Sequence, residues 1–143
     1  MKENINALDE INKGSVMGMD AIHYIIDKVL DNKFKTVLER QYKSYEKISD
    51  KIKKIYSKYD NNDEPHETNA MTKLMTKSGI EMKTLTDTSN SKIAELLLQG
   101  TNMGIIEGRR ILNNKVVNEE VEKIVDEYVG MQEKYVEILK TYL

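Results

Sequence analysis

Two short stretches of the sequence, GSVMGM at residues 14–19 and GTNMGI at residues 100–105, are nearly the same string. Each places two glycines four residues apart, in a segment whose apolar residues recur every three or four positions, as on one face of a helix. A glycine inside a helix costs about 0.5–1 kcal/mol relative to alanine. We therefore expect a close contact between helices to offset this cost.

The similarity between the two stretches extends over a whole helical hairpin. With a shift of 86 residues, Gly14 corresponds to Gly100 and Gly18 corresponds to Gly104. Beyond the intervening turn the matching pairs are Leu38 with Ile124, Tyr42 with Tyr128, and Ile52 with Ile138. The sequence therefore predicts a duplicated hairpin, and so an all-α four-helix bundle that forms a single domain over residues 1–143.

Apolar seams predict four long helices, at about 3–31, 33–60, 88–113 and 118–142. The expected seam of the first helix contains Leu8, Ile11, Ser15, Gly18, Ile22, Ile25 and Val29. The expected seam of the last helix contains Val121, Ile124, Tyr128, Met131, Tyr135, Ile138 and Tyr142. Each seam covers one face, which predicts that the helices pack around a common core.

The break between the first two helices, at residues 31–33, is short enough to force an antiparallel hairpin. Asn32 is expected to end the first helix, since asparagine tolerates the left-handed conformation found at helix ends. The connection at about 61–87 is much longer and is expected to contain a short helix at about 69–86. Such a helix spans about 27 Å at about 1.5 Å per residue, which predicts a crossover along the whole bundle.

This crossover would relate the two hairpins by a two-fold axis and bring the first and third helices together. Gly14, Gly18, Gly100 and Gly104 are then predicted to meet where these helices cross, with Gly108 as a further packing glycine. Counted from the turns, Gly18 lies level with Tyr45, and Gly104 lies level with residues 128–131, so small residues would make room for large ones. The alternative is that these glycines bend the helices or face solvent.

Composition excludes several classes of function. The 143 residues include no cysteine, which rules out disulfides and thiolate metal ligands. The net charge of −2 gives no support to electrostatic nucleic-acid binding. No apolar run is long enough for a membrane span, and the N-terminus does not resemble a signal peptide. These features predict a cytoplasmic protein that binds neither nucleic acid nor membrane.

The chain as a whole resembles the ferritin-like superfamily in architecture. The strings SKIAELLLQG at 91–100 and GTNMGIIEGRR at 100–110 are similar to those of a clostridial group of small helical proteins without an established activity. The resemblance implies a bundle with one long crossover, in a bacterial cytoplasmic or spore-associated setting. Ferritin-like metal sites use Glu-x-x-His on two helices. Neither the second nor the fourth helix contains it, and Gly18 and Gly104 occupy the levels where carboxylates would stand. No metal or other cofactor is therefore expected.

A non-standard metal site is the alternative that the charged residues leave open. Asp20 and His23 share a face of the first helix, while Glu39, Glu46 and Glu107 flank the seams of other helices. Glu107 could instead pair with Arg110 three residues later. His66 belongs to an acidic linker, where a solvated loop is the simpler interpretation, and Arg109-Arg110 is weak evidence for phosphate binding.

The third helix is apolar nearly all round, and more so than one bundle core requires. We expect the excess to be covered by the crossover helix or by a second copy of the chain. The residues expected at a homodimer interface are Met17, Met103 and Ile106, which flank the seams.

Three hypotheses about function follow. The first is a non-enzymatic ferritin-like bundle that acts by self-association or partner binding. The second is an atypical ferritin-like metalloprotein, an oxidase or a metal store, with a carboxylate, histidine and tyrosine site. The third is a small-ligand binder with a cavity beside the glycines.

Overall fold

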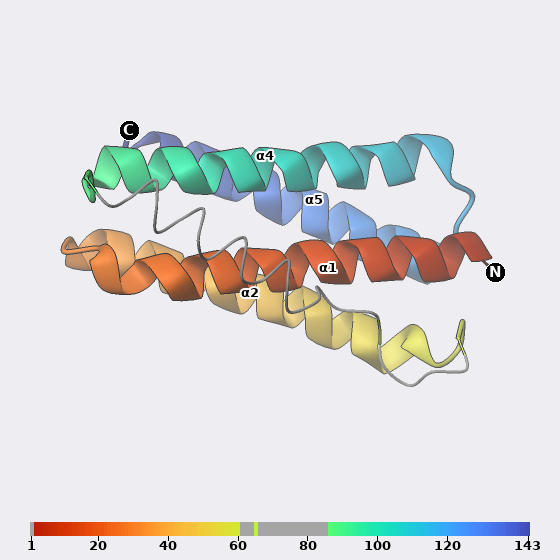
Figure 1. Ribbon diagram of the computed structural model, residues 1–143. Coiled ribbons are helices and arrows are strands. Elements are labelled where there is room, and N and C mark those ends of the chain that lie inside the picture. Colours follow the sequence, from red (N-terminus) through yellow and green to blue (C-terminus); the bar gives the residue numbers. More distant parts are fainter. Residues whose placement is uncertain (1, 61–64, 66–85) are drawn as a thin grey trace.

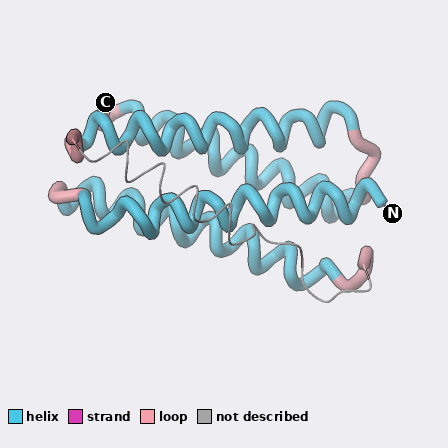
Figure 2. Tube along the Cα trace, viewed as in Figure 1, coloured by secondary structure: helices cyan, strands magenta, loops and turns pink. Residues whose placement is uncertain are grey.

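The computed structural model describes residues 2–60, 65 and 86–143, and this part of the chain is helical without strands. The long helices are α1 (Lys2–Ile25), α2 (Asn32–Tyr56), α4 (Asn90–Asn114) and α5 (Glu119–Lys140). They lie side by side as a four-helix bundle (Figure 1). Short turns join α1 to α2 and α4 to α5 at opposite ends of the bundle (Figure 2).

The chain leaves α2 at one end of the bundle and enters α4 at the other (Figure 1). Two hydrogen bonds fix this arrangement. Asn90 Nδ2 donates to Asp31 Oδ2 at 3.1 Å, so α4 begins beside the α1–α2 turn. The backbone N–H of Asn118 donates to Asn4 Oδ1 at 2.7 Å, so α5 begins beside the start of α1. The predicted crossover at 61–87, with its short helix at about 69–86, lies almost wholly outside the described residues.

The turn between α1 and α2 differs from the prediction. The helix α1 ends at Ile25 and is followed by a short 3₁₀ helix, η1 (Ile26–Lys28). The Asp31 side chain then caps α2 by accepting the backbone N–H groups of Lys33 at 2.9 Å and Phe34 at 3.1 Å. No described non-glycine residue has a positive φ, so the left-handed conformation expected at Asn32 is wrong. An aspartate cap at the start of α2 forms the break instead.

In the second hairpin, the N-termini of both helices are also stabilised by polar or charged side chains. Ser89 caps α4 by accepting the backbone N–H of Lys92 at 3.2 Å. The first turn of α5 contains three carboxylates, Glu119, Glu120 and Glu122, which stabilise the positive end of the helix dipole. The two hairpins are therefore closed by local signals that the sequence carries.

The expected seam of α1 lines the core, and so do Ala94, Leu97, Thr101, Gly104, Gly108 and Ile111, which recur every three or four positions on α4. In α5 the expected Val121, Ile124, Tyr128 and Tyr135 are buried, and the seam departs from the prediction at two positions. The side chains of Gln132 and Leu139 are buried in place of Met131 and Ile138, which are half-buried. Buried positions consequently recur 86 residues apart between α1 and α4, and 87 residues apart between α2 and α5, because the spacing from Ile111 to Val121 is one residue longer than that from Ile25 to Phe34. The pairing of Leu38 with Ile124 is thus corrected to Leu38 with Val125.

The register shift places two pairs of core residues in corresponding positions, Gln41 with Tyr128 and Tyr45 with Gln132. All four side chains are almost completely buried. A layer of tyrosine and glutamine side chains thus crosses the middle of the core. None of the described helices combines the length and the apolar character needed to cross a membrane.

Candidate ligand pocket between α1 and α4

Three of the predicted packing glycines accommodate phenol rings from the opposite helices. A Cβ at Gly18 would lie 2.5 Å from Cε2 and Cζ of Tyr45 on α2. A Cβ at Gly104 would lie 2.7 Å from the Tyr128 hydroxyl on α5, and one at Gly14 would lie 3.2 Å from Tyr128 Cζ. The nearest atoms belong to side chains of α2 and α5. These glycines therefore make room for those side chains, and not for the expected backbone contact between facing glycines.

The other two predicted glycines differ from each other. Gly108 packs against Val129, and a Cβ there would contact that side chain. Gly100 is exposed, and a Cβ there would have no atom of the described residues within 4 Å. The interpretation of Gly100 as a close-packing glycine is therefore corrected: it borders open space.

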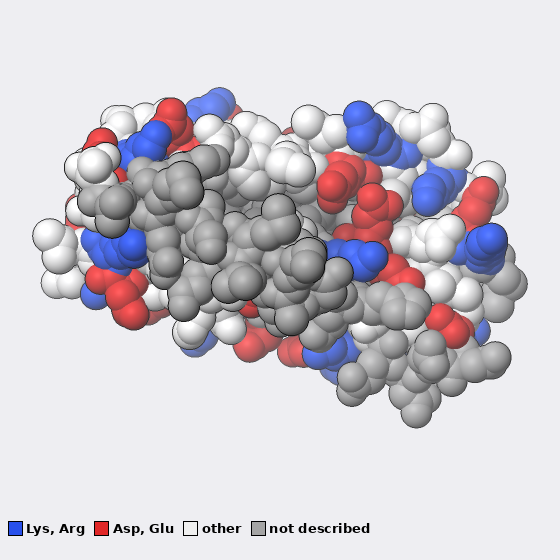
Figure 3. All heavy atoms as spheres, in the orientation of Figure 1, with Lys and Arg blue, Asp and Glu red and all other residues white. Residues whose placement is uncertain are grey.

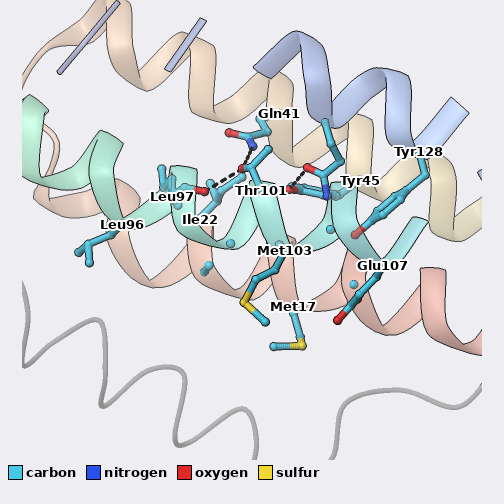
Figure 4. Close-up of a pocket in the computed structure, with 16 residues that line it drawn as sticks. Met17, Ile22, Gln41, Tyr45, Leu96, Leu97, Thr101, Met103, Glu107 and Tyr128 are labelled. Atoms are coloured by element: carbon cyan, nitrogen blue, oxygen red, sulfur yellow. Dashed lines mark hydrogen bonds between the residues drawn. The ribbon is translucent and has the colours of Figure 1, made fainter. Parts of the chain in front are cut away.

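That open space is a pocket of about 200 Å³ between α1 and α4. Residues of these two helices form its sides, and residues of α2 and α5 form its inner wall (Figure 4). The lining residues are Gly14, Met17, Gly18, Ala21, Ile22, Gln41, Tyr45, Leu96, Leu97, Gly100, Thr101, Met103, Gly104, Glu107, Tyr128 and Gln132.

Hydrogen bonds hold the inner wall in place. The Tyr45 hydroxyl donates to Gln132 Oε1 at 2.6 Å, which joins α2 to α5. The Thr101 hydroxyl donates to the Leu97 carbonyl at 2.7 Å and accepts Gln41 Nε2 at 3.5 Å. These bonds fix the orientation of the polar side chains that border the pocket.

One polar atom of this wall has no partner. Gln41 is only 1% exposed, and its Oε1 makes no hydrogen bond with any atom of the described residues. A buried acceptor without a donor costs about 1–3 kcal/mol. Gln41 lines the pocket, so a hydrogen-bond donor placed there could remove that cost.

The two phenols of the wall remain uncharged. Burial raises the pKa of the Tyr45 hydroxyl and that of the Tyr128 hydroxyl above the ordinary value of 10.0. The two rings lie 6.5 Å apart between centroids. At neutral pH they are therefore hydrogen-bonding groups with aromatic faces, and not bases.

Glu107 is the one charged residue among the described residues that line the pocket. Burial raises the pKa of its carboxyl, the negative charge of Glu10 raises it further, and Arg110 lowers it. The alternative ion pair between Glu107 and Arg110 does not form within the described residues, and the neighbouring Arg109 bonds Glu133 at 2.9 Å. Glu107 thus keeps a poorly compensated charge at the pocket.

The other candidate metal ligands do not gather around Glu107. Within the described residues, no group of three histidine, aspartate or glutamate side chains is placed to hold a metal ion. His23 and Glu39 border a separate depression together with Tyr42 and Lys43. Glu46 is exposed on α2. His66 lies outside the described residues.

The predicted interface residues are exposed on the outer side of α1 and α4. Met17 is 38%, Met103 is 59% and Ile106 is 51% exposed. Met17 and Met103 also border the pocket, where both point away from the inner wall (Figure 4). Ile106 does not line the pocket, so a substitution at Ile106 changes the outer surface without changing the pocket lining.

Four buried polar residues were not predicted from the sequence, and one of them is Asn4, which accepts the backbone N–H of Asn118. Gln132 was missed because the expected seam passed through Met131. Asn12 and Ser49 were missed because each directly follows a seam isoleucine; the Ser49 hydroxyl donates to Asn12 Oδ1 at 2.7 Å. A short polar residue beside a seam position is the signal that could have identified them.

Comparison with known proteins adds no further assignment: no family model, no curated protein and no solved structure matches this chain. The pocket geometry is therefore the basis for a functional proposal.

Proposed function

We propose that this protein is a non-enzymatic binding module whose bundle takes a small, largely apolar molecule into the pocket between α1 and α4. The observation that carries the proposal is the unpartnered Gln41 Oε1 in the wall of an otherwise mostly apolar pocket. A ligand with an apolar body and a hydrogen-bond donor matches both features.

The size of the pocket suits such a ligand. An apolar protein cavity of about 150 Å³ is large enough to bind benzene. The pocket here is larger, at about 200 Å³, and has the side chains of Ile22, Leu96 and Leu97 beside its polar wall. A single aromatic ring with a short polar substituent is therefore a suitable probe.

For the architecture, we propose a ferritin-like bundle that arose from a duplicated hairpin. Two observations support it: α2 and α4 are connected across the length of the bundle, and buried positions recur between the hairpins. The hydrogen bond between Tyr45 and Gln132 joins corresponding positions of the two hairpins. A tyrosine and glutamine layer then occupies the middle of the core.

Binding of benzyl alcohol, measured by isothermal titration calorimetry, tests the proposed pocket. The wild-type protein should bind it, and Gly100→Leu should abolish binding because the new side chain grows into the open space of the pocket. Gly130→Leu is the matched control, since a Cβ at Gly130 also meets no atom within 4 Å in the part of the chain that the structure describes, but Gly130 does not line the pocket. Equal binding by both variants would refute the proposed site.

A second candidate function is self-association through the outer surface of α1 and α4. The exposure of Met17, Met103 and Ile106 favours it, since apolar side chains gathered on one surface often mark an interface. Sedimentation of the wild-type protein should then show a homodimer, and Ile106→Glu should give a folded monomer. A wild-type monomer at high micromolar concentration would exclude this interface.

A further inference from the structure

We propose that the pocket selects a positively charged ligand, an apolar amine whose ammonium group pairs with Glu107 and Glu10 while its apolar body occupies the pocket. This inference rests on the proposed function, because it specifies the charge of the molecule that the pocket binds.

The first step is the position of the two carboxylates. Glu107 lines the pocket from α4, and Glu10 lies on α1, close enough for the charges of the two carboxylates to repel. The charges of both carboxylates also raise the pKa of the Tyr128 hydroxyl, and Tyr128 lines the pocket together with Glu107. Figure 3 shows acidic side chains over the region where α1 and α4 face each other.

The second step is that no ion pair within the described residues compensates the negative charge of Glu107. No hydrogen bond or ion pair within the described residues reaches Glu107, and Arg110 acts on it only at longer range. Two like charges beside a half-buried site favour a cation and disfavour an anion there. A bound ammonium group would offset the repulsion between Glu107 and Glu10 and would donate hydrogen bonds to the carboxylate.

The third step concerns the surroundings of the bound cation. The aromatic side chains of Tyr45 and Tyr128 line the same pocket, and aromatic faces attract cations. The thioether groups of Met17 and Met103 border the outer side and adapt to apolar groups of different shape. The combination suits an organic ammonium ion better than a small inorganic cation, which would require several oxygen ligands.

Gln41 stands at the other end of the pocket. It is bonded to Thr101, which precedes Glu107 by six residues on α4, or about 9 Å at a rise of about 1.5 Å per residue. An amine held by Glu107 therefore extends its apolar body toward Gln41. A second donor at the far end of the ligand would reach the free oxygen of Gln41.

Three probes that share one ring test the charge preference: benzylamine, benzyl alcohol and benzoate, compared by calorimetry at pH 7 and low salt. We expect benzylamine to bind about tenfold more tightly than benzyl alcohol, which corresponds to one partly buried charge pair. Benzoate should bind more weakly than either. Glu107→Gln should remove most of the preference for benzylamine over benzyl alcohol, with both affinities measured on the same variant.

Glu122→Gln is the control for the loss of one negative charge, because Glu122 is exposed in the first turn of α5. It should preserve the preference for benzylamine. If benzyl alcohol binds in a manner that Gly100→Leu blocks, but benzylamine binds no more tightly, the charge inference fails and the pocket remains. If none of the three probes binds, both the inference and the proposed function fail.

Discussion

The side of the bundle formed by α1 and α4 and the side formed by α2 and α5 are packed by residues of different size. On the seams of α1 and α4 the central residues are small, among them Ser15, Gly18 and Gly104, and a pocket remains between the helices. On α2 and α5 the central residues are large, and the Tyr45 hydroxyl donates directly to Gln132. The phenols reach across the core into the space that the glycines leave, but they do not fill all of it.

Charges follow the same division. Lys51 Nζ on α2 bonds both carboxylate oxygens of Glu127 on α5, at 2.7 and 2.6 Å. On the other side, Glu10 of α1 and Glu107 of α4 repel each other. Among the described residues, one side is thus closed by complementary size and charge, whereas the other side has a pocket with like charges beside it, which is an arrangement suited to binding.

The largest effect on the free energy of unfolding is expected from leucine substitutions at two glycines that line the pocket. Gly18→Leu should lower the free energy of unfolding by about 3 kcal/mol, the upper end of the usual cost of overpacking, because the rigid ring of Tyr45 occupies the space. Gly104→Leu should cost somewhat less, since part of its clash is with the flexible Gln132 side chain. Urea denaturation followed by circular dichroism gives both values.

Gly100→Leu is the internal control for that experiment, because it also places leucine at a pocket glycine. At Gly100, however, the new Cβ meets no atom of the described residues within 4 Å. It should leave the stability nearly unchanged. An equal loss of stability at Gly18 and Gly100 would show that the two positions have the same surroundings.

The next effect concerns the hydrogen bond that joins α2 to α5. Tyr45→Phe leaves the buried Gln132 Oε1 without its donor and should cost about 1–3 kcal/mol. Tyr135→Phe serves as the comparison, since its hydroxyl meets Ser44 at 3.4 Å in a partly buried position. We expect a smaller loss there, and a loss of equal size would mean that the central layer has no special role in holding the helices together.

A smaller effect of opposite sign is expected from alanine at the open glycines. Gly100→Ala and Gly130→Ala should each raise the free energy of unfolding by about 0.5–1 kcal/mol, because alanine favours the helix and nothing obstructs its Cβ. Gly14→Ala, at the position that corresponds to Gly100, should instead be destabilising because of the Tyr128 ring. The same sign for Gly14 and Gly100 in thermal unfolding would contradict the assigned difference.

The pair Gly14 and Gly100 also shows how far sequence reasoning reaches. The two positions look alike in the sequence, and only the three-dimensional arrangement shows that one faces a phenol and the other faces open space. The positions of Tyr45 and Tyr128 opposite the glycines could be predicted by counting from the turns, because helical rise is constant. The pocket could not be predicted, since it depends on how far those rings reach.

The seams show the same limit. Those of α1 and α4 follow from their spacing alone, since apolar and small residues there alternate at three and four positions. In α5, Met131 and Gln132 are adjacent, and which of them is buried depends on the spacing from Ile111 to Val121, which is one residue longer than that from Ile25 to Phe34. The Asp31 cap, by contrast, could be predicted from the sequence, because an aspartate directly before the first residue of a helix is a local capping signal. The prediction instead ends the first helix at Asn32.

The smallest expected effect compares two carboxylates under a change of pH. The pKa of Glu107 is raised above the ordinary 4.5, so the folded state holds this proton more tightly than the unfolded state. Stability therefore falls as the pH rises from about 4.5 through the raised pKa, and Glu107→Gln should be more stable than the wild type at pH 7. Below the ordinary pKa this advantage should disappear.

Glu120 should behave in the opposite way. The Tyr59 hydroxyl and the Lys58 ammonium hydrogen-bond to its carboxylate and lower its pKa. It contributes stability above pH 4.5 that is lost as the pH falls through the lowered pKa, so Glu120→Gln should be less stable than the wild type at pH 7. Urea midpoints at pH 7 and pH 4 measure both differences. Opposite signs at pH 7 that converge at pH 4 would support the contrast between the open and the closed side, whereas equal signs at pH 7 would remove its electrostatic part.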